Sequence, residues 1–356
     1  MERSFGIDWI RITVVFMLFP FHTARVFDRW EPFYVKDTVN EFSTWLVGSL
    51  GFWFMSLLFV TAGYSAYHAL QKRGVKDYAN ERVKKLLVPL LFGLVLIVPV
   101  QGYVAQLQFD KTEVSYWVFL KDYFINFEDL SGYTGGFTPA HLWFILFLCV
   151  ISLSLLPVMK ALLKKERQLY AGKEFYVLFG FMAMIVADCL PDIGGKNPFL
   201  YGLLFLFGFI LAQLQNIMDF LRKAYKFILP AGMMLIPMYL IVVNSINWAE
   251  ASFPLRLGAD FLKNICAWWM IMGLIGFADH MFHRQSRLLQ YLGKASYPVY
   301  IVHQSVLVVV AYFIVQIGIS PWLKYMGIMS ISLLISLLLY EIFRRIRITR
   351  LILGMK

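Results

Sequence analysis

Four ionisable side chains interrupt the first strongly apolar stretch of the sequence, FGIDWIRITVVFMLFPFHTARVF (5–27). They are Asp8, Arg11, His22 and Arg25. Their spacing is close to multiples of the helical repeat, so a helix places them on one stripe about 100° wide. Ionisable groups at membrane depth cost roughly 2.5 to 3.5 kcal/mol each, so this stripe is expected to face protein or water and to be functional. The alternative is an Asp8–Arg11 pair at one interface and an Arg25 anchor at the other.

His22 is the residue of this stripe best suited to acid–base chemistry. A helix rises about 1.5 Å per residue, which puts His22 about 16 Å along the axis from Arg11, in the other half of a membrane. A neutral imidazole that titrates near neutrality can take a proton from a hydroxyl group. The alternative for a lone buried histidine is packing against satisfied neighbours, but the polar stripe around it favours a general base.

Further candidate residues lie at the ends of later apolar segments. HLWFILFL (141–148) begins with His141 and Trp143, on the side toward which His22 points. Trp143 alone is also typical of an interfacial belt. In LGKASYPVYIVHQS (292–305), Lys294 precedes Tyr300 and His303, which are three positions apart and therefore point into one cavity from a helix.

The composition indicates which elements position these residues. Of 356 residues, 60% are hydrophobic and 15% are charged, and the mean hydropathy is +0.65. Soluble domains average about 45 to 50% apolar and about 25% charged residues, so the chain is predicted to be an integral membrane protein. Its apolar runs are continuous, which excludes barrel strands. We predict an all-α fold, a polytopic transmembrane helical bundle in which residues 1–356 form a single domain.

Ten apolar runs are candidate membrane spans. The fifth and sixth are short, and PDIGGKNP (191–198) between them predicts a tight turn from its Pro and Gly residues. The ten runs are 5–27, 45–70, 86–107, 142–159, 175–190, 199–215, 227–246, 262–282, 298–319 and 322–343.

The formal charge of +11 reflects membrane topology rather than binding to nucleic acid. Connections rich in Lys and Arg alternate with poor ones; together with Arg3 the rich ones hold 23 such residues, and the others hold seven. By the positive-inside rule both termini are cytoplasmic. The rich connections are 71–85, 160–174, 214–226, 283–297 and 344–356.

Two further features concern cofactors and the cytoplasmic ends of the spans. The three cysteines lack metal-ligand or CxxC spacing, so no disulfide framework, metal site or bound cofactor is expected. NERVKKLLVP (80–89) brings Arg82 and Lys85 to the cytoplasmic end of the third span. Contact with anionic lipid headgroups of the surrounding membrane is one interpretation of these basic residues.

Several motifs distributed along the chain resemble those of the acyltransferase-3 family of integral membrane O-acyltransferases. The resemblance covers essentially the whole chain. Within the family, some of the motifs are most similar to those of the branch that succinylates periplasmic glucans. The first motifs are Arg11 with His22 eleven positions later, Arg82 and Lys85 before Pro89, and ASYPVYIVHQ (295–304). The motifs similar to that branch are FPFH (19–22), FVTAGYSAY (59–67), HLWFILFL (141–148) and LLLYEIFRR (337–345).

The resemblance implies transfer of an acyl group, succinyl or acetyl, from cytoplasmic acyl-coenzyme A to a hydroxyl of an extracytoplasmic glycan or glycoconjugate. Acyl-coenzyme A is then a co-substrate, and the setting that fits best is a bacterial cytoplasmic (inner) membrane. His22 is implied to be catalytic and Arg11 to support it. Where the family usually has two arginines, this chain has Arg82 and Lys85. Because lysine cannot form a bidentate fork on phosphate, Lys85 either binds the donor less specifically or serves only as an anchor.

Together, the residues and the resemblance predict two binding regions beside His22. Basic groups at a cytoplasmic mouth suit the phosphates of coenzyme A, and one donor on the acceptor side would stabilise the oxyanion of the thioester carbonyl. The predicted acyl-coenzyme A site comprises Asp8, Arg82, Lys85, Lys294, Tyr300 and His303. The predicted acceptor or oxyanion side comprises Arg25, Tyr64, His141 and Trp143.

The alternative is a secondary transporter or flippase of a glycan or small anionic metabolite, which would also have about ten spans and charges at mid-membrane. Such proteins usually show repeat symmetry and broken helices at corresponding positions of two halves, and this sequence shows neither. A noncatalytic scaffold or sensor is a third interpretation. Only an enzyme would consume the thioester of acyl-coenzyme A.

Overall fold

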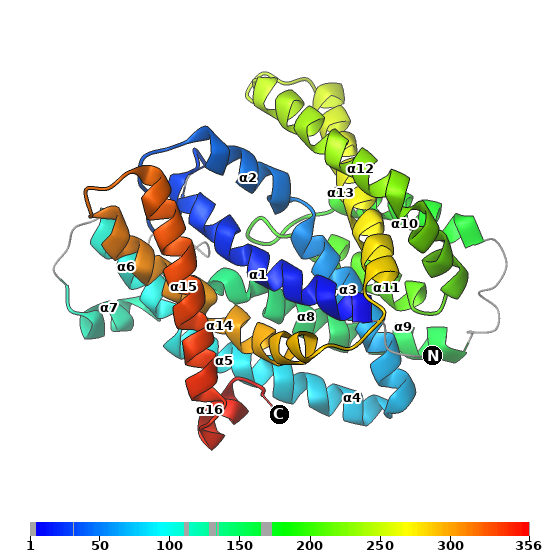
Figure 1. Cartoon of the computed structure of the whole chain (residues 1–356), viewed down its shortest axis with the longest axis horizontal. Coiled ribbons are helices and arrows are strands. Elements are labelled where there is room, and N and C mark those ends of the chain that lie inside the picture. Colours follow the sequence, from blue (N-terminus) through cyan, green and yellow to red (C-terminus); the bar gives the residue numbers. More distant parts are fainter. Residues whose placement is uncertain are drawn as a thin grey trace. The chain divides into compact units, whose positions relative to one another are not determined.

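The chain is helical throughout the part described by the computed structural model, which comprises residues 5–30, 32–109, 114–127, 133, 135–164 and 173–355. No strand occurs in these residues, so the predicted all-α class is confirmed (Figure 1). The helices are α1 (Phe5–Phe27), α2 (Glu41–Gly51), α3 (Phe54–Lys72), α4 (Val75–Arg82), the π-helix η1 (Val83–Leu87), α5 (Val88–Leu96), α6 (Pro99–Phe109), α7 (Tyr116–Tyr123), the 3₁₀-helix η2 (Ala140–Leu142), α8 (Trp143–Ser154), α9 (Leu156–Lys164), α10 (Lys173–Asp188), α11 (Pro198–Leu211), α12 (Gln215–Ser245), α13 (Phe253–Met281), α14 (Arg287–Val315), α15 (Pro321–Phe343) and α16 (Arg347–Ile352).

Each predicted span coincides with helical segments. Among the described residues, seven helical stretches are long and apolar enough to cross a membrane. The pair α8 and α9, bent by 51°, makes an eighth if it is one broken span, and α10 and α11 are apolar but short. The chain is therefore a multi-pass membrane protein. The count of ten spans and the location of the termini stay predictions.

The connection between α10 and α11 is the tight turn that the sequence predicts. Ile193 and Lys196 exchange backbone hydrogen bonds of 2.8 and 3.2 Å across two glycines. Gly194 and Gly195 have φ angles of 59° and 71°, a conformation that two-residue turns require and that glycine adopts without strain. The side chain of Asn197 then caps the start of α11.

The helices form two compact units, each built from three stretches of chain. The first unit comprises residues 1–14, 48–79 and 150–289. The second unit comprises residues 15–47, 80–149 and 290–356. Helix α1 therefore contributes its first turns to one unit and the remainder to the other.

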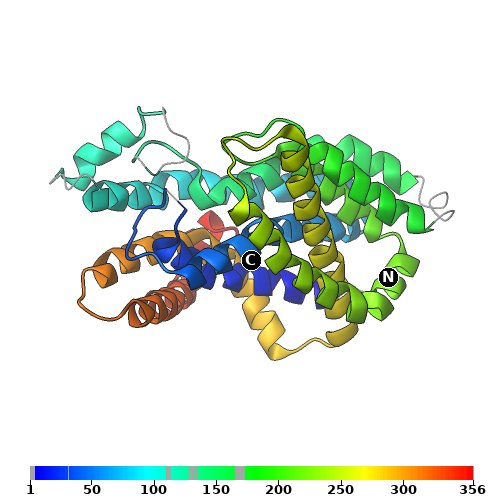
Figure 2. The same ribbon diagram turned by 90° about the horizontal axis from the view of Figure 1, so that it is seen from above.

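In the first unit, helices pack through close approach of their backbones. Helices α12 and α13 lie side by side in both ribbon views (Figures 1 and 2), and α3 packs on α11. A Cβ added to Gly63 or Gly208 would overlap the backbone carbonyl of the facing helix, at Phe205 and Val60 respectively. Small residues at helix contacts are the usual device by which membrane helices approach each other closely.

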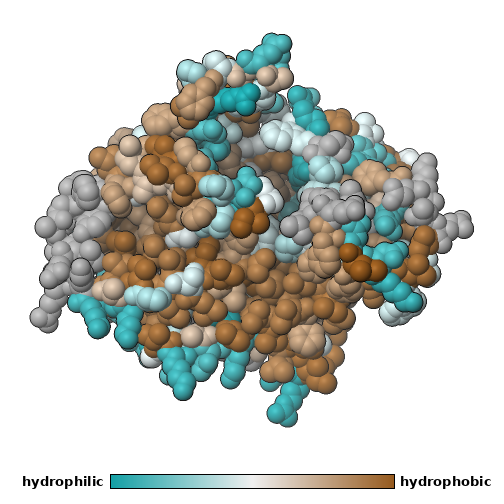
Figure 3. Space-filling view, turned by 180° about the vertical axis from the view of Figure 1, so that it is seen from behind, coloured by the Kyte–Doolittle hydropathy of each residue, from teal (hydrophilic) through white to brown (hydrophobic). Residues whose placement is uncertain are grey.

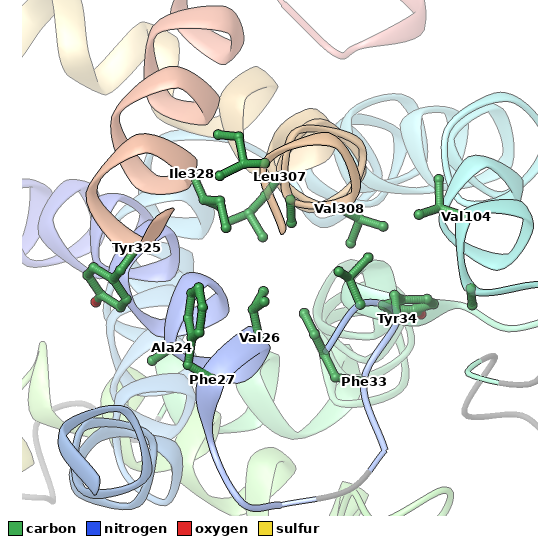
Figure 4. Packing of buried hydrophobic residues seen from close by; sticks show 14 of the residues in the cluster. Ala24, Val26, Phe27, Phe33, Tyr34, Val104, Leu307, Val308, Tyr325 and Ile328 are labelled. Carbon is green, nitrogen blue, oxygen red and sulfur yellow. The ribbon is translucent and has the colours of Figure 1, made fainter. Parts of the chain in front are cut away.

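In the second unit, an apolar cluster holds the end of α1 near α14. Leu307 and Val308 of α14 lie around the same interior as Val26 of α1 and Phe33 of the following segment (Figure 4). Tyr325 of α15 belongs to this cluster, and its hydroxyl donates to the Pro20 carbonyl at 3.1 Å. This packing sets the position of the last turns of α1, which carry His22.

The exposed surface is suited to a membrane. Hydrophobic side chains cover broad areas of the face drawn in Figure 3, and hydrophilic side chains lie along its lower edge and in its upper part. On α12, Phe227 is 80% exposed and Met234 is 75% exposed. Large exposed apolar areas are unusual on soluble proteins and are expected where lipid is the solvent.

Candidate active site

Three histidines from separate stretches of chain meet in the second unit. The ring centroid of His303 in α14 lies 5.3 Å from that of His22 in α1 and 5.0 Å from that of His141 in η2. His141 and His303 are buried, and His22 is half-buried. The sequence predicted that His22 and His141 point toward one region but assigned His303 to the donor site. The structure brings all three together, and we call them the histidine cluster.

His141 is fixed by hydrogen bonds at both ring nitrogens. Nε2 lies 2.8 Å from the carbonyl oxygen of Ile301, which can only accept, so Nε2 carries the proton. Nδ1 then accepts a hydrogen bond from Nε2 of Gln101 at 3.2 Å. The same amide donates to Oγ of Ser305 at 2.8 Å, and that hydroxyl donates to the Ile97 carbonyl at 2.8 Å. His141 is thereby held as a neutral imidazole in one orientation.

The backbone immediately before His141 is strained. Ala140 has a φ of 43°, the only positive φ of a non-glycine residue in the described parts of the chain. The left-handed conformation costs an L-residue roughly 1 to 2 kcal/mol. A hydrogen bond of 2.9 Å from the Ala140 N–H to Oγ1 of Thr138 helps to hold it. Strain of this kind is concentrated at functional sites, which supports a functional position for His141.

His303 and His22 each have one buried ring nitrogen with no hydrogen-bond partner among the described residues. These are Nε2 of His303 and Nδ1 of His22. Nδ1 of His303 lies 2.6 Å from the Tyr300 carbonyl oxygen and donates to it, so Nε2 is the unprotonated nitrogen of the neutral ring. An unpaired buried polar atom costs about 1 to 3 kcal/mol, so its presence needs an explanation such as catalysis. Two such atoms on neighbouring imidazoles are suited to handling a proton.

Aromatic rings surround this pair. The ring of His22 stacks on Phe33 with centroids 6.2 Å apart and an interplanar angle of 11°, and Phe21 meets it edge-on at 5.2 Å. Phe19 approaches the ring of His303 at 5.8 Å. Apolar walls lower the local dielectric, and electrostatic interactions with a reacting group are stronger there than in water.

Tyr300 contacts the histidine cluster directly, whereas Trp143 contacts an aromatic residue of its own helix. The hydroxyl of Tyr300 donates to the carbonyl of His141, and its ring lies 5.6 Å from that of His303. Tyr300, which was predicted to bind the donor, contacts two of the histidines. Trp143 is half-buried, and its ring lies 5.6 Å from that of Phe147 in the same helix.

Arg25 is bound to the segment that follows α1. Its Nη1 donates to Oδ2 of Asp28 at 2.6 Å and to the Trp30 carbonyl at 3.0 Å, and its Nη2 donates to the Pro32 carbonyl at 2.7 Å. Asp28 is fully buried and also accepts from Nζ of Lys36 at 2.7 Å. A buried carboxylate between two cations is costly to disrupt. Arg25 therefore folds this segment over the end of α1, in addition to any contact with substrate.

Arg82 and Lys85 lie at an irregular helical turn. Arg82 ends α4, Lys85 belongs to the π-helix η1, and Pro89 follows in α5. Because proline has no N–H, the carbonyl of Lys85 lacks the usual partner four residues later. The hydroxyl of Tyr297 in α14 donates to this carbonyl at 2.6 Å instead. Short π-helical turns occur often at functional sites.

The side chains at this turn are only partly buried. The ammonium of Lys85 pairs with Glu81, and Lys85 is 36% exposed. Arg82 is half-buried, and Lys294, three residues before Tyr297 in α14, is exposed. The structure therefore connects the Arg82–Lys85 turn to the helix that carries Lys294 and His303.

Three predicted site residues belong to the first unit. Nη1 of Arg11 lies 3.8 Å from Oδ1 of Asp8 and 3.5 Å from Oγ of Ser65, so the i, i+3 pair considered from the sequence is present. The side chain of Arg11 is 49% exposed. Tyr64 is buried, and its ring lies 5.2 Å from that of His68. All the other predicted site residues belong to the second unit.

Sequence reasoning missed Gln101 and Ser305. Both are buried and both take part in the hydrogen bonds that orient His141. Each stands in an apolar run, VPVQGYV and HQSVLVV, where a neutral polar residue needs a partner. The sequence therefore shows that Gln101 and Ser305 need hydrogen-bond partners, but it does not show which residues these partners are.

The histidine cluster and the cysteines are of the residue types that ligate metals. Across the described ranges, no group of three or more His, Cys, Asp or Glu side chains is arranged to hold a metal ion. The cysteines are free thiols; Cys149 and Cys266 are buried and Cys189 is exposed.

The fold and the site thus define a multi-pass membrane protein in which three imidazoles meet among apolar helices. The model of the acyltransferase-3 family, which describes an acyltransferase domain, matches residues 4–341. The chain belongs to this family and is an enzyme that transfers acyl groups other than aminoacyl groups. The resemblance seen in the motifs is confirmed, and the enzyme interpretation prevails over the transporter.

Two similar relatives share one name. Glucans biosynthesis protein C of Shigella dysenteriae serotype 1 (strain Sd197) is 23% identical over 368 residues, which cover 97% of this chain and 92% of the relative. Glucans biosynthesis protein C of Escherichia coli (strain K12) has the same identity and coverage. No solved structure matches the chain.

Proposed function

We propose that this enzyme is a membrane O-acyltransferase that moves a succinyl or acetyl group from cytoplasmic acyl-coenzyme A to a hydroxyl of an extracytoplasmic glycan or glycoconjugate. Family membership supports acyl transfer. The glycan acceptor is carried over from the relatives named glucans biosynthesis protein C. The observation that carries the proposal is the contact between His22 and His303, each with an unpaired buried nitrogen.

In the proposed reaction His22 is the general base. It takes the proton of the acceptor hydroxyl as the oxygen attacks the thioester carbonyl carbon. The tetrahedral intermediate collapses with cleavage of the carbon–sulfur bond, and the imidazolium returns the proton to the thiolate of coenzyme A. The products are an ester and free coenzyme A. Direct transfer needs no acyl-enzyme, and the buried hydroxyl of Ser305 in the hydrogen bonds around His141 donates to the Ile97 carbonyl rather than to a histidine.

The two substrates are proposed to approach from opposite sides. Phosphates of coenzyme A suit the basic groups Arg82, Lys85 and Lys294 of the second unit. Asp8 and Arg11 of the first unit stay candidates for the donor on the sequence alone. On the acceptor side, Arg25, Tyr64, His141 and Trp143 remain the candidates for contacts with sugar or oxyanion. Among them, His141 has both nitrogens engaged, so it would act through the position of its ring.

The proposed setting is the bacterial inner membrane, with one domain of about ten spans and both termini in the cytoplasm. The alternation of basic connections supports this topology. It places the Arg82–Lys85 turn on the cytoplasmic side, where acyl-coenzyme A is made. It also places His22 in the outer half of the membrane, toward the acceptor.

The test is an assay of the full chain purified in detergent. Radiolabelled succinyl- or acetyl-coenzyme A is incubated with periplasmic glucan, and thioester loss and glucan ester gain are measured by thiol titration and mass spectrometry. Both are expected to rise together and to depend on the acceptor. The proposal is wrong if neither donor is consumed with any glycan, while vesicles carrying the protein move glycan across the bilayer unmodified.

A further inference from the structure

We propose that His303 is a positioning residue that fixes the tautomer of the catalytic His22. Its Nε2 would accept a hydrogen bond from Nδ1–H of His22, so that Nε2 of His22 is the nitrogen that takes the substrate proton. This inference rests on the proposed acyl transfer and assigns His303 a role different from donor binding.

The first step concerns which nitrogen of His303 can accept. Nδ1 donates to the Tyr300 carbonyl at 2.6 Å within the same helix, so the neutral ring has its lone pair on Nε2. His303 is fully buried, and this Nε2 has no partner among the described residues. A buried acceptor aimed among aromatic rings requires a donor from a neighbouring group.

The second step identifies the donor. The ring of His22 lies 5.3 Å from that of His303, and its buried nitrogen without a described partner is Nδ1. His22 as a whole is half-buried, and Nδ1 is the one of its two ring nitrogens that is both buried and without a partner in the described residues. If Nδ1 carries the proton and faces His303, Nε2 is left as the base. Catalytic hydrogen bonds are often long in the absence of substrate and shorten in the reactive complex.

The third step excludes the other neighbour. His141 lies 5.0 Å from His303 at an interplanar angle of 86°, but both its nitrogens are bound, to Gln101 and to the Ile301 carbonyl. It therefore cannot serve as the donor to His303. Its ring instead packs edge-on against that of His303.

The resulting chain runs from the Tyr300 carbonyl through two imidazoles to the acceptor hydroxyl. The hydroxyl proton moves to Nε2 of His22, and the positive charge that forms there is stabilised by the lone pair of His303. The proton later leaves Nε2 for the sulfur of coenzyme A. His303 itself keeps its proton on Nδ1 throughout, as an orienting partner of a catalytic imidazole does.

Two substitutions of His303 separate this role from a structural one. Asparagine places a donor where Nδ1 lies and keeps the bond to Tyr300, but it has nothing at the place of Nε2. Glutamine can place an acceptor where Nε2 lies and loses that bond. His303→Asn is expected to lower kcat about 10- to 100-fold, and His303→Gln to recover much of the loss, with KM for acyl-coenzyme A unchanged in both.

The controls make each outcome decisive. His283→Asn changes an exposed histidine outside the cluster and is expected to leave kcat unchanged. Thermal unfolding verifies that each variant is folded, and wild-type turnover in the same assay tests the proposed function separately. The inference is overturned if folded His303→Asn turns over like wild type, if the loss is entirely in KM for acyl-coenzyme A, or if His303→Gln is no more active than His303→Asn.

Discussion

Two polar clusters within apolar helices differ in how completely their groups are paired. In the first unit, Nζ of Lys263 lies 2.8 Å from Asp188 and 3.1 Å from Asp260, and Nδ2 of Asn264 donates to Asp188 at 3.0 Å. None of these four side chains has a buried polar atom without a partner in the described residues. The histidine cluster, by contrast, leaves two ring nitrogens unpaired.

The difference separates polar groups that hold helices together from polar groups that do chemistry. A paired charge has its hydrogen-bonding capacity taken up by its partner and has none left for a substrate, and removing the partner leaves a buried charge uncompensated. An unpaired imidazole keeps that capacity and makes the fold less stable, as active sites commonly do. Substitutions in the first cluster should therefore change stability, and substitutions in the second should change turnover.

The largest effect is expected for His22→Ala. Loss of a general base typically lowers the rate 10²- to 10⁴-fold, so we expect kcat to fall about 10³-fold with little change in melting temperature. Turnover of labelled acyl-coenzyme A and thermal unfolding measure the two quantities. His283→Ala, at an exposed histidine, is the matched control. Near-normal activity of His22→Ala would remove the basis of the proposed mechanism.

Asp188→Ala should do the reverse. It removes the shared partner of Lys263 and Asn264, and we expect the free energy of unfolding to fall by about 2 kcal/mol with kcat unchanged. Chemical unfolding in detergent measures this. Asp260→Ala is the control, because this carboxylate is 58% exposed and its loss should cost under about 1 kcal/mol. A large fall in kcat without a fall in stability would erase the contrast between the two clusters.

Ala140→Gly tests whether strain is stored beside His141. Glycine adopts a φ of 43° without the steric cost, although it loses more entropy on folding, so a net gain in stability of about 0.5 to 1 kcal/mol is expected. Ala140→Val should instead lose stability, because a β-branched residue tolerates this conformation least. Equal melting temperatures for all three proteins would show that the position is unstrained.

The smallest effect concerns a half-exposed charge, which belongs to neither kind of cluster. Lys85→Arg restores the arginine that the family usually has, and its planar fork should lower KM for acyl-coenzyme A about 3-fold at constant kcat. Lys84→Arg, at the exposed neighbouring position, is the control and should have no effect. A response of both positions alike would point to general attraction of anions by lipid-facing charge.

The sequence predicted the helices well because membrane-spanning helices consist of long apolar runs, which are easy to recognise. All ten runs coincide with helical segments, and the glycines at 194 and 195 predicted their turn from local chemistry alone. Hydropathy marks the apolar part of a helix, but it does not predict how far the helix continues beyond that part. It therefore missed that α12 extends back to Gln215 and that α8 breaks before α9.

The candidate site was only partly predictable. Helical periodicity gives the face on which His22 lies, but it does not give the helix that this face meets. The contact with His303 joins residues near opposite ends of the chain and follows from packing around Val26 and Leu307. Gln101 could be recognised as a polar residue in an apolar run, yet its partner His141 depends on how α6 meets η2.

One helix joins the two ends of the proposed substrate path. In α14, Tyr297 holds the Lys85 carbonyl and His303 lies beside His22, with Pro298 between them. Proline donates no hydrogen bond to the carbonyl four residues earlier, so bending of the helix at this position would break no such bond. Movement of the Arg82–Lys85 turn would then either tilt the part of α14 that carries His303 or be taken up by bending at Pro298. Which of the two happens decides whether binding of coenzyme A at the turn changes the position of His303 relative to His22.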